Sequence, residues 1–334
     1  MSIILHHTDM DGFCSARIAR DTLLDPFDQD CVFIPYNYKG GLDKIEFKNN
    51  KKLIIVDLCC NKEIEEFIRR ALTSGLSVIH IDHHASGVEY YNQHMTDLDD
   101  NEDYSKWFCP KESASMLTWV YSFMGEYARK HIDAIAIDYA EDYSSFMMDG
   151  SGNMYGIPVG IRYINDNDVF RHQFPESKKF VKGLYSLKRD EIKPWAGIWN
   201  NILSSTDRIA EAKLISGYIE KGIEAIAVEE KEFARERMNA FEVEIFGLKI
   251  MALNTTKRSS DVFGNMFNTA DAVICFNYFK NRTWTYTFYS NNKVNVIELM
   301  HKIEENWPES IYNIGGHPYA GGCSSKKCIF DLID

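Results

Sequence analysis

The sequence predicts an α/β protein with a mainly parallel sheet and flanking helices, followed by a smaller mixed α/β C-terminal domain. Short apolar runs alternate with longer helical patterns through the first half of the chain, which is typical of β/α units around a parallel sheet. Runs of the β type return after position 246. The length of 334 residues exceeds the size at which one hydrophobic core usually stops growing, so we expect two domains.

Three short apolar runs in the first half are predicted as strands, and acidic or histidine residues follow each of them. These strands are Ser2–Leu5, Lys52–Val56 and Ser77–Ile81. Helices are predicted at Gly12–Leu24, Asn61–Ser74, Glu112–His131 and Ile132–Phe146. Asn61 is a favourable N-cap residue because its side chain can accept a hydrogen bond from the first turn of the helix.

The second half begins with a segment rich in Ala, Ile, Glu, Lys and Arg at 207–241, which predicts one or two long helices. Strands are predicted at Leu248–Leu253, Ala272–Phe279 and Trp284–Tyr289, a helix at Val296–Asn306, and a Gly-rich loop at Gly315–Gly322. The predicted boundaries are a first domain at 1–205, a helical linker at 206–242 and a second domain at 243–334.

Composition limits the class of partner. The 37 Lys and Arg residues against 49 Asp and Glu give a net charge of −12, which argues against a broad electrostatic contact with duplex nucleic acid. Eight cysteines without a CxxC pair indicate reduced thiols in a cytoplasmic protein. The N-terminal apolar run is too short for a signal peptide, and no stretch approaches the roughly 20 apolar residues of a membrane span. We therefore expect no membrane contact; a homodimer is compatible with the sequence.

Candidate metal ligands alternate just beyond the first predicted strand, at His7, Asp9 and Asp11. Alternate residues of an extended segment project to the same side, so these three can converge on one cation. The alternative is that the two aspartates are solvated residues at the start of a helix, where Asp is favoured.

Further acidic and histidine residues follow the other two strands. Asp57 comes directly after the second strand, and Asp82, His83 and His84 come after the third. A buried carboxylate needs a compensating charge, and open parallel sheets place ligands beyond the carboxyl ends of their strands. The sequence therefore predicts a metal site here. The run Tyr163–Phe170 is either an Asn- and Asp-rich turn or the source of one more carboxylate.

Carboxylates with imidazoles and no thiolate favour Mn2+ or Mg2+, with Zn2+ or Co2+ possible. Two such ions about 3.5 to 4 Å apart lower the pKa of a bridging water and neutralise phosphoryl oxygens. The predicted reaction is therefore hydrolysis of a phosphate ester or anhydride. In the second domain, the Gly-rich segment around His317 can approach an anion closely with its backbone amides. Alternatively, it is a tight turn packed against the sheet.

These elements, in this order, resemble the DHH phosphoesterase superfamily, which includes RecJ-type exonucleases, nanoRNA-degrading enzymes and exopolyphosphatases. His7–Gly12 resembles motif I, Asp57 resembles motif II, and Asp82-His83-His84 resembles the name-giving motif III. Gly315-Gly316-His317, with Ala320 and Gly321, resembles the GGGHxxAAG signature of the DHH-associated C-terminal domain.

The resemblance implies roles for individual residues. The metal ligands would be His7, Asp9, Asp11, Asp57, His83 and Asp166, with Asp57 bridging two ions and Asp168 as the alternative to Asp166. His84 would act near the leaving group, and Asp82 would orient a neighbouring ligand. The substrate-binding residues would be Ser290, Gly315, Gly316 and His317. Tyr289 stands where many members have arginine, so a phosphate-binding guanidinium is replaced.

The predicted function is a Mn2+-dependent phosphodiesterase of the exonuclease or nanoRNase kind. It would hydrolyse short single-stranded nucleic acid or a small nucleotide and release nucleoside monophosphates. The alternatives are an exopolyphosphatase or pyrophosphatase acting on phosphoanhydrides, and a nucleotide sensor without turnover. Trp284 and Tyr286 belong either to a base-stacking face or to the core of the second domain.

Overall fold

The computed structural model describes residues 1–25, 30–131, 146–148, 154–171, 173–203, 208–279, 282–308 and 310–333. The chain forms two compact units, Met1–Ile226 and Ala227–Asp334. The predicted helix at Ile132–Phe146 lies almost entirely outside the described residues. None of the described helices is both long enough and apolar enough to span a membrane.

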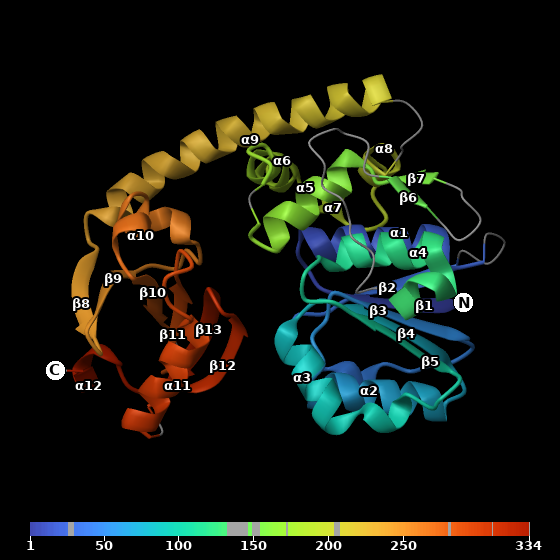
Figure 1. Cartoon of the computed structure of the whole chain (residues 1–334), viewed down its shortest axis with the longest axis horizontal. Helices are drawn as coiled ribbons and strands as arrows, with labels where there is room; N and C mark the ends of the chain where they lie inside the picture. Colours follow the sequence, from blue (N-terminus) through green and yellow to red (C-terminus); the bar gives the residue numbers. More distant parts are fainter. Residues whose placement is uncertain are drawn as a thin grey trace. The chain divides into compact units, whose positions relative to one another are not determined.

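The first unit is built on a five-stranded parallel sheet (Figure 1). Its strands are β1 (Ser2–His6), β2 (Cys31–Pro35), β3 (Lys52–Val56), β4 (Ser77–Asp82) and β5 (Tyr104–Phe108). The strand order is β2-β1-β3-β4-β5, and every pair is parallel. The predicted parallel sheet is therefore confirmed. All five strands point the same way, so the carboxyl ends of β1, β3 and β4 lie along one edge.

Helices cover both faces of this sheet. The described helices of this unit are α1 (Met10–Leu23), α2 (Lys62–Thr73), α3 (Ala85–His94), α4 (Ala114–His131), α5 (Val159–Asp168), α6 (Ser177–Tyr185), α7 (Arg189–Ile192) and α8 (Ile198–Ile202). Helices α1 and α4 lie over one face, and α2 and α3 lie over the other (Figure 1). A short antiparallel pair, β6 (Phe146–Met148) and β7 (Met154–Gly156), completes the described part of this unit.

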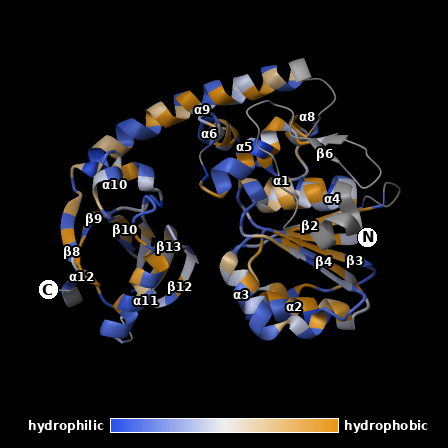
Figure 2. Cartoon of the chain, viewed as in Figure 1, coloured by the Kyte–Doolittle hydropathy of each residue, from blue (hydrophilic) through white to orange (hydrophobic). Residues whose placement is uncertain are grey.

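Alternation along the strands divides the core into two layers. Ile4 and Ile54 pack beneath α1 and α4, whereas Ile3, Leu5 and Leu53 pack against α2. Successive side chains of a strand point to opposite faces, so a strand buried on both sides reads as a continuous apolar run. This explains the high hydropathy of the strands in Figure 2.

The helix termini show why these segments fold as they do. Asn61 caps α2, because its side chain accepts a hydrogen bond from Ile64 N at 3.0 Å, as predicted. The predicted helix after the first strand begins at Met10 and not at Gly12, and Asp9 is its N-cap. The acidic run at 163–170 is not a loop, since α5 continues through it to Asp168.

The second unit is a mixed sheet with helices, which confirms the predicted C-terminal architecture. Its strands are β8 (Phe241–Ile245), β9 (Leu248–Asn254), β10 (Ala272–Tyr278), β11 (Trp284–Tyr289), β12 (Tyr312–His317) and β13 (Ala320–Ser325). Their order is β12-β13-β11-β10-β9-β8, with β9 and β10 parallel and the other neighbours antiparallel. Its helices are α10 (Met266–Thr269), α11 (Val296–Asn306) and α12 (Phe330–Ile333), and α9 (Arg208–Arg237) runs through the boundary between the units.

The Gly-rich segment differs from the prediction. It is not a loop but a hairpin, in which β12 pairs with β13 through His317 and Ala320. Glycine in a strand often marks a close backbone approach, and Gly316 has φ +128°, with the carbonyl oxygen of Ala320 2.6 Å from an added Cβ. Gly316 therefore has a packing role in the hairpin itself.

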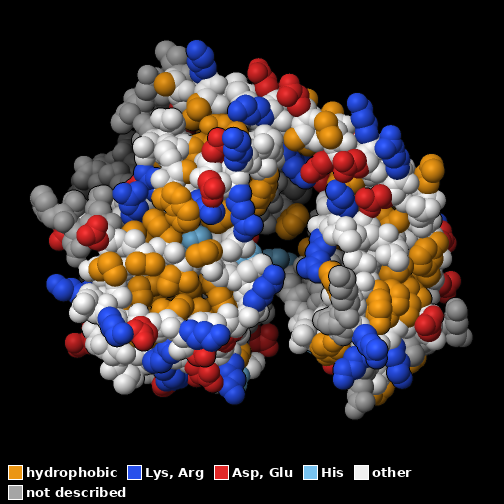
Figure 3. Space-filling model, turned by 180° about the vertical axis from the view of Figure 1, so that it is seen from behind, with side chains coloured by type: hydrophobic (Ala, Val, Ile, Leu, Met, Phe, Trp, Pro, Cys, Tyr) orange, Lys and Arg blue, Asp and Glu red, His pale blue; other side chains and the backbone are white. Residues whose placement is uncertain are grey.

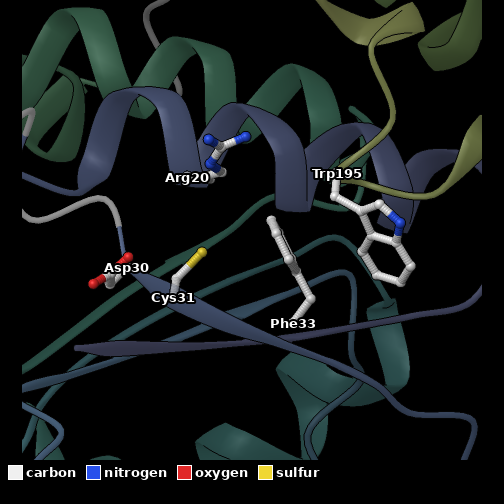
Figure 4. Close-up of a pocket in the computed structure, with 5 residues that line it drawn as sticks. All are labelled: Arg20, Asp30, Cys31, Phe33 and Trp195. Carbon is white, nitrogen blue, oxygen red and sulfur yellow. The ribbon is translucent and has the colours of Figure 1, made fainter.

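A pocket of about 440 Å³ lies beside the edge strand β2 (Figure 4). It is lined by Arg20 of α1, by Asp30, Cys31 and Phe33, and by Trp195. The rings of Phe33 and Trp195 are 5.9 Å apart. Apolar side chains also reach the surface of this unit on the face shown in Figure 3. None of the candidate metal ligands lines this pocket, so it is separate from the site described next.

Candidate metal centre

The loop after β1 brings three candidate ligands to the start of α1. Asp9 caps the helix, because its Oδ1 accepts a hydrogen bond from Gly12 N at 2.9 Å. A side chain at position 12 would place Cβ only 2.5 Å from the carbonyl oxygen of His7. Glycine therefore lets the first turn of α1 pack directly on the backbone of His7. Asp9 is thus both a helix cap and a close neighbour of His7, so the two interpretations of this segment are compatible.

His7 links the first two ligand loops. Its Nδ1 lies 2.7 Å from Asp9 Oδ2 and 3.7 Å from Asp57 Oδ2, and its Nε2 lies 3.3 Å from Asn37 Oδ1. Burial lowers the pKa of His7, but interactions with the carboxylates of Asp57 and Asp9 outweigh it and raise the pKa to about 11. A positive charge among these carboxylates is therefore strongly favoured.

Asp11 belongs to α1, and its almost completely buried carboxylate lies at the N-terminus of α4. Its two carboxylate oxygens accept hydrogen bonds from Ala114 N at 2.7 Å and from Ser115 N at 3.0 Å. Backbone N–H groups at a helix start favour a negative charge. Burial nevertheless raises the pKa of Asp11, so these contacts do not fully compensate for its lost hydration.

Asp57 stands at the centre of the cluster, directly after β3. Its φ of 58° is in the left-handed region, which is uncommon for residues other than glycine and clusters at functional sites. The residue is 1% exposed, and its Oδ2 has no hydrogen-bond partner among the described residues. Burial, then the charges of Asp9 and Asp11, raise the pKa of Asp57 to about 6. A buried carboxylate in this setting needs a cation.

The residues at the end of β4 make two different sets of contacts. The Nε2 of His83 lies 3.3 Å from Asp57 Oδ1 and 3.3 Å from Asp168 Oδ2. The carboxylate of Asp82 turns to His84, with Oδ1 2.7 Å from His84 Nδ1 and Oδ2 accepting from His84 N at 3.2 Å. Burial lowers the pKa of His84, but the Asp82 charge outweighs it and raises the pKa.

The structure places Asp168 in the cluster and Asp166 outside it, which corrects the choice of Asp166 made from the sequence. The carboxylate of Asp166 accepts hydrogen bonds from Gln173 N, Phe174 N and Ser177 Oγ at 2.8, 3.2 and 2.6 Å. Side chains two residues apart on an α-helix are rotated by about 200° around the helix axis. Because α5 extends through this run, Asp166 and Asp168 point to opposite sides.

Three groups of side chains could each hold a metal ion, because the ligand atoms within each group lie within 4.8 Å of one another. They are His7 with Asp9 and Asp57, Asp57 with His83 and His84, and Asp11 with His83 and Asp168. Asp57 and His83 each belong to two groups, so the groups join into one cluster. The Oδ2 of Asp168 is also buried without a hydrogen-bond partner in the described part of the chain. Oxygen and imidazole donors around uncompensated charge fit one or two hard divalent ions.

Residues 1–148 match the model of the DHH family, N-terminal domain. The chain therefore carries a DHH-family N-terminal domain over this part of its length. The matched region contains His7, Asp9, Asp11, Asp57 and the motif at 82–84. The family and the cluster together indicate a metal-dependent hydrolase of phosphoesters or phosphoanhydrides.

Several solved structures are similar to this chain. The DHH domain of a member of a ribosomal protein family is 15% identical with a TM-score of 0.56, and the match covers 97% of this chain and 82% of that one. An exopolyphosphatase-related protein from Bacteroides fragilis is 12% identical, with a TM-score of 0.48 and coverage of 99% and 90%. RecJ in complex with Mn2+ from Thermus thermophilus is 12% identical, with a TM-score of 0.46 and coverage of 99% and 50%. A comparison with curated protein sequences gave no match.

The predicted substrate residues lie in β12 and just beyond β11, in the second unit. Ser290 is buried, and its Oγ donates to Asp271 O at 2.9 Å and accepts from Lys293 N and Val294 N. This hydroxyl therefore closes a turn. Gly315 differs, because an added Cβ would meet nothing within 4 Å. His317 ends β12, and a role in binding substrate stays a prediction for both residues.

The aromatic strand β11 belongs to the core of the second unit. Tyr286 is 1% exposed, and its hydroxyl accepts a hydrogen bond from Ile329 N at 3.0 Å. The ring of Trp284 packs 6.1 Å from that of Phe276. The core alternative for Tyr286 is therefore correct, and Tyr286 presents no face to a base.

Side chains that the sequence did not single out also contact the ligand loops. Tyr185, at the end of α6, accepts a hydrogen bond from Met10 N, and Tyr38 accepts one from Cys59 N. Asn37 contacts His7. These residues are far from their partners along the chain, so no local pattern could identify them.

Proposed function

We propose that this protein is a metal-dependent phosphodiesterase that hydrolyses short single-stranded oligonucleotides or small nucleotides and releases nucleoside monophosphates. One observation carries the proposal. Buried and half-buried carboxylates that follow β1 and β3, together with one from α5, converge with His83 at one edge of the parallel sheet, and charge repulsion and burial leave them in need of cations.

The residues of the cluster fit a dinuclear site. Asp57 belongs to two ligand groups, which supports it as the bridging ligand, and His7, Asp9, Asp11, His83 and Asp168 would complete the two sites. Mn2+ is the proposed ion because the donors are carboxylates and imidazoles. When bound, divalent ions would lower the pKa of a nucleophilic water and neutralise phosphoryl oxygens.

The remaining residues would manage protons and position. Asp82 holds Nδ1 of His84 at 2.7 Å, which fixes the orientation of the imidazole. The charge of Asp82 raises the pKa of His84 against the effect of burial, which favours the protonated ring. His84 would therefore donate a proton to the leaving oxygen of the scissile bond.

A turnover panel tests the proposal. The purified protein is incubated with Mn2+ or Mg2+ and with dinucleotides, longer single strands, cyclic dinucleotides, 3′-phosphoadenosine 5′-phosphate and polyphosphate. Release of nucleoside monophosphates from the dinucleotides is the expected result. Preferred release of inorganic phosphate from polyphosphate would replace the proposal with a phosphoanhydride hydrolase. Binding of nucleotides without hydrolysis of any substrate would make the protein a sensor.

A further inference from the structure

Two tyrosines at the metal cluster combine an anchored hydroxyl with an exposed ring. Tyr185 is 47% exposed and Tyr38 is 39% exposed. The hydroxyl of Tyr185 accepts a hydrogen bond from Met10 N at 2.9 Å, between two candidate ligands. The hydroxyl of Tyr38 accepts one from Cys59 N at 2.6 Å, two residues after Asp57. Both rings are therefore attached to the loops that carry the ligands.

Nearby carboxylates act on both hydroxyls. Burial, then the charge of Asp9, raises the pKa of Tyr185, and burial, then the charge of Asp82, raises the pKa of Tyr38. The ring of Tyr38 also lies 6.0 Å from that of His7. Each tyrosine thus holds its polar end against the cluster, while a large part of the side chain stays accessible.

An anchored aromatic ring is a suitable surface for stacking. The hydrogen bond at the far end of the ring fixes its orientation, so little conformational entropy remains to be lost when a planar ligand packs on it. Stacking on aromatic side chains tolerates any nucleobase, because every base has a π-face. Inorganic polyphosphate has no planar group and would gain nothing from these rings.

The contacts of the cluster point the same way. In the described part of the chain, Asp9, Asp11 and Asp57 make their hydrogen bonds and ion pairs with backbone amides and histidines, not with lysine or arginine. A site for a long inorganic polyanion would be expected to place cationic side chains beside the ions. The side chains of Tyr38 and Tyr185 next to the ligand loops offer aromatic rings instead.

We propose that Tyr38 and Tyr185 form a stacking subsite for the base of a nucleotide whose phosphate lies at the metal cluster. The inference rests on the proposed function and specifies its substrate class: phosphate esters that carry a planar heterocycle next to the scissile bond. Tyr38 and Tyr185 would then determine specificity without taking part in the chemical step.

The experiment compares two ligands that differ only in the base. Dissociation constants of AMP and ribose 5-phosphate are measured by calorimetry in the presence of Mn2+. We expect the wild type to bind AMP about tenfold more tightly. Tyr185→Leu and Tyr38→Leu should each reduce AMP affinity about fivefold or more and leave ribose 5-phosphate unchanged. Tyr185→Phe keeps the ring and should keep most of the preference.

Two controls separate stacking from a structural effect. Tyr278, which is 49% exposed at the end of β10 in the second unit, gives the matched variant Tyr278→Leu, which should behave as the wild type. Mn2+ affinity, measured by electron paramagnetic resonance, should be unchanged in the Tyr38 and Tyr185 variants. If these variants weaken AMP and ribose 5-phosphate equally, or lower Mn2+ affinity, the tyrosines only position the ligand loops and the subsite is refuted.

The subsite and the proposed function fail in different ways. Equal affinity of the wild type for AMP and ribose 5-phosphate overturns the subsite, whatever the protein hydrolyses. A tyrosine-dependent preference for AMP without hydrolysis of any phosphoester leaves the subsite intact and overturns the phosphodiesterase.

Discussion

The two motif regions of this chain place their polar residues in opposite situations. At the metal cluster, Asp57 and Asp168 each keep a buried oxygen without a hydrogen-bond partner among the described residues. In the second unit, the hydroxyl of Ser290 closes a turn by making three hydrogen bonds. A polar group that the fold already satisfies contributes to stability, whereas a buried one that the fold does not satisfy needs an outside partner.

The same contrast separates the glycines of the two regions. Gly12 is required by the fold, since a side chain there would overlap the backbone of His7, whereas space for a Cβ is open at Gly315. Where the space around a motif glycine is open, packing within the fold does not explain why glycine occupies the position. The comparison therefore separates motif residues that could bind a ligand from those that stabilise the fold.

The largest expected effect follows from Asp57→Asn. The amide keeps the size of the side chain but removes the charge that two ligand groups share. Since loss of an outer partner of a ligand already costs about 10- to 100-fold, we expect kcat to fall on the order of 10³-fold or more. Steady-state kinetics with Mn2+ check this, and circular dichroism shows whether the variant is folded. Turnover within a few-fold of the wild type would remove Asp57 as the bridging ligand.

Asp168 and Asp166 give a paired test of the same contrast. Asp168→Asn should weaken Mn2+ binding by about 10- to 100-fold with little effect on stability. Asp166→Asn should leave Mn2+ affinity unchanged but lower the free energy of unfolding by about 1 to 3 kcal/mol, because three donors, including the buried hydroxyl of Ser177, lose their carboxylate. Calorimetric metal titration and urea unfolding measure the two quantities. A reversed result would return the final ligand to position 166.

The sequence was sufficient to place the candidate ligands at the strand ends. A continuous apolar run shows where a buried strand stops, so Asp57 and the residues at 82–84 could be placed at one sheet edge without coordinates. The edge strand β2 gave no such signal, because its residues Cys31–Pro35 are only partly buried. The long helix at 207–241 was also predictable, and α9 confirms it.

The sequence did not predict which side of a helix a residue occupies, or which residues distant along the chain are in contact. Choosing between Asp166 and Asp168 requires knowing that α5 continues through this Asn- and Asp-rich run. The local sequence is equally typical of a turn. Tyr185 reaches Met10 across 175 residues, a relation that no periodicity records. Glycines at 315 and 316 predicted a loop, but pairing with β13 outweighs their weak strand propensity.

The two motif glycines give a smaller effect that differs between the regions. Gly12→Ala places Cβ 2.5 Å from the carbonyl oxygen of His7, so the loop must shift. We expect a loss of about 1 to 3 kcal/mol in unfolding free energy and reduced Mn2+ affinity. Gly315→Ala should change stability by less than about 0.5 kcal/mol. Urea unfolding distinguishes the two; equal destabilisation would show that the second region is also fixed by packing.

His317 and Ser290 provide the smallest and most specific comparison. If the hairpin contacts substrate phosphate, His317→Ala should raise KM about tenfold, since a hydrogen bond to a charged group contributes about 1.5 kcal/mol or more, and should leave kcat nearly unchanged. Ser290→Ala should lower the unfolding free energy by about 1 to 2 kcal/mol through the broken turn, with KM unaffected. Initial rates over a range of dinucleotide concentrations, combined with urea unfolding, measure both effects. An unchanged KM in His317→Ala would make the hairpin a structural element and confine substrate recognition to the metal cluster and its tyrosines.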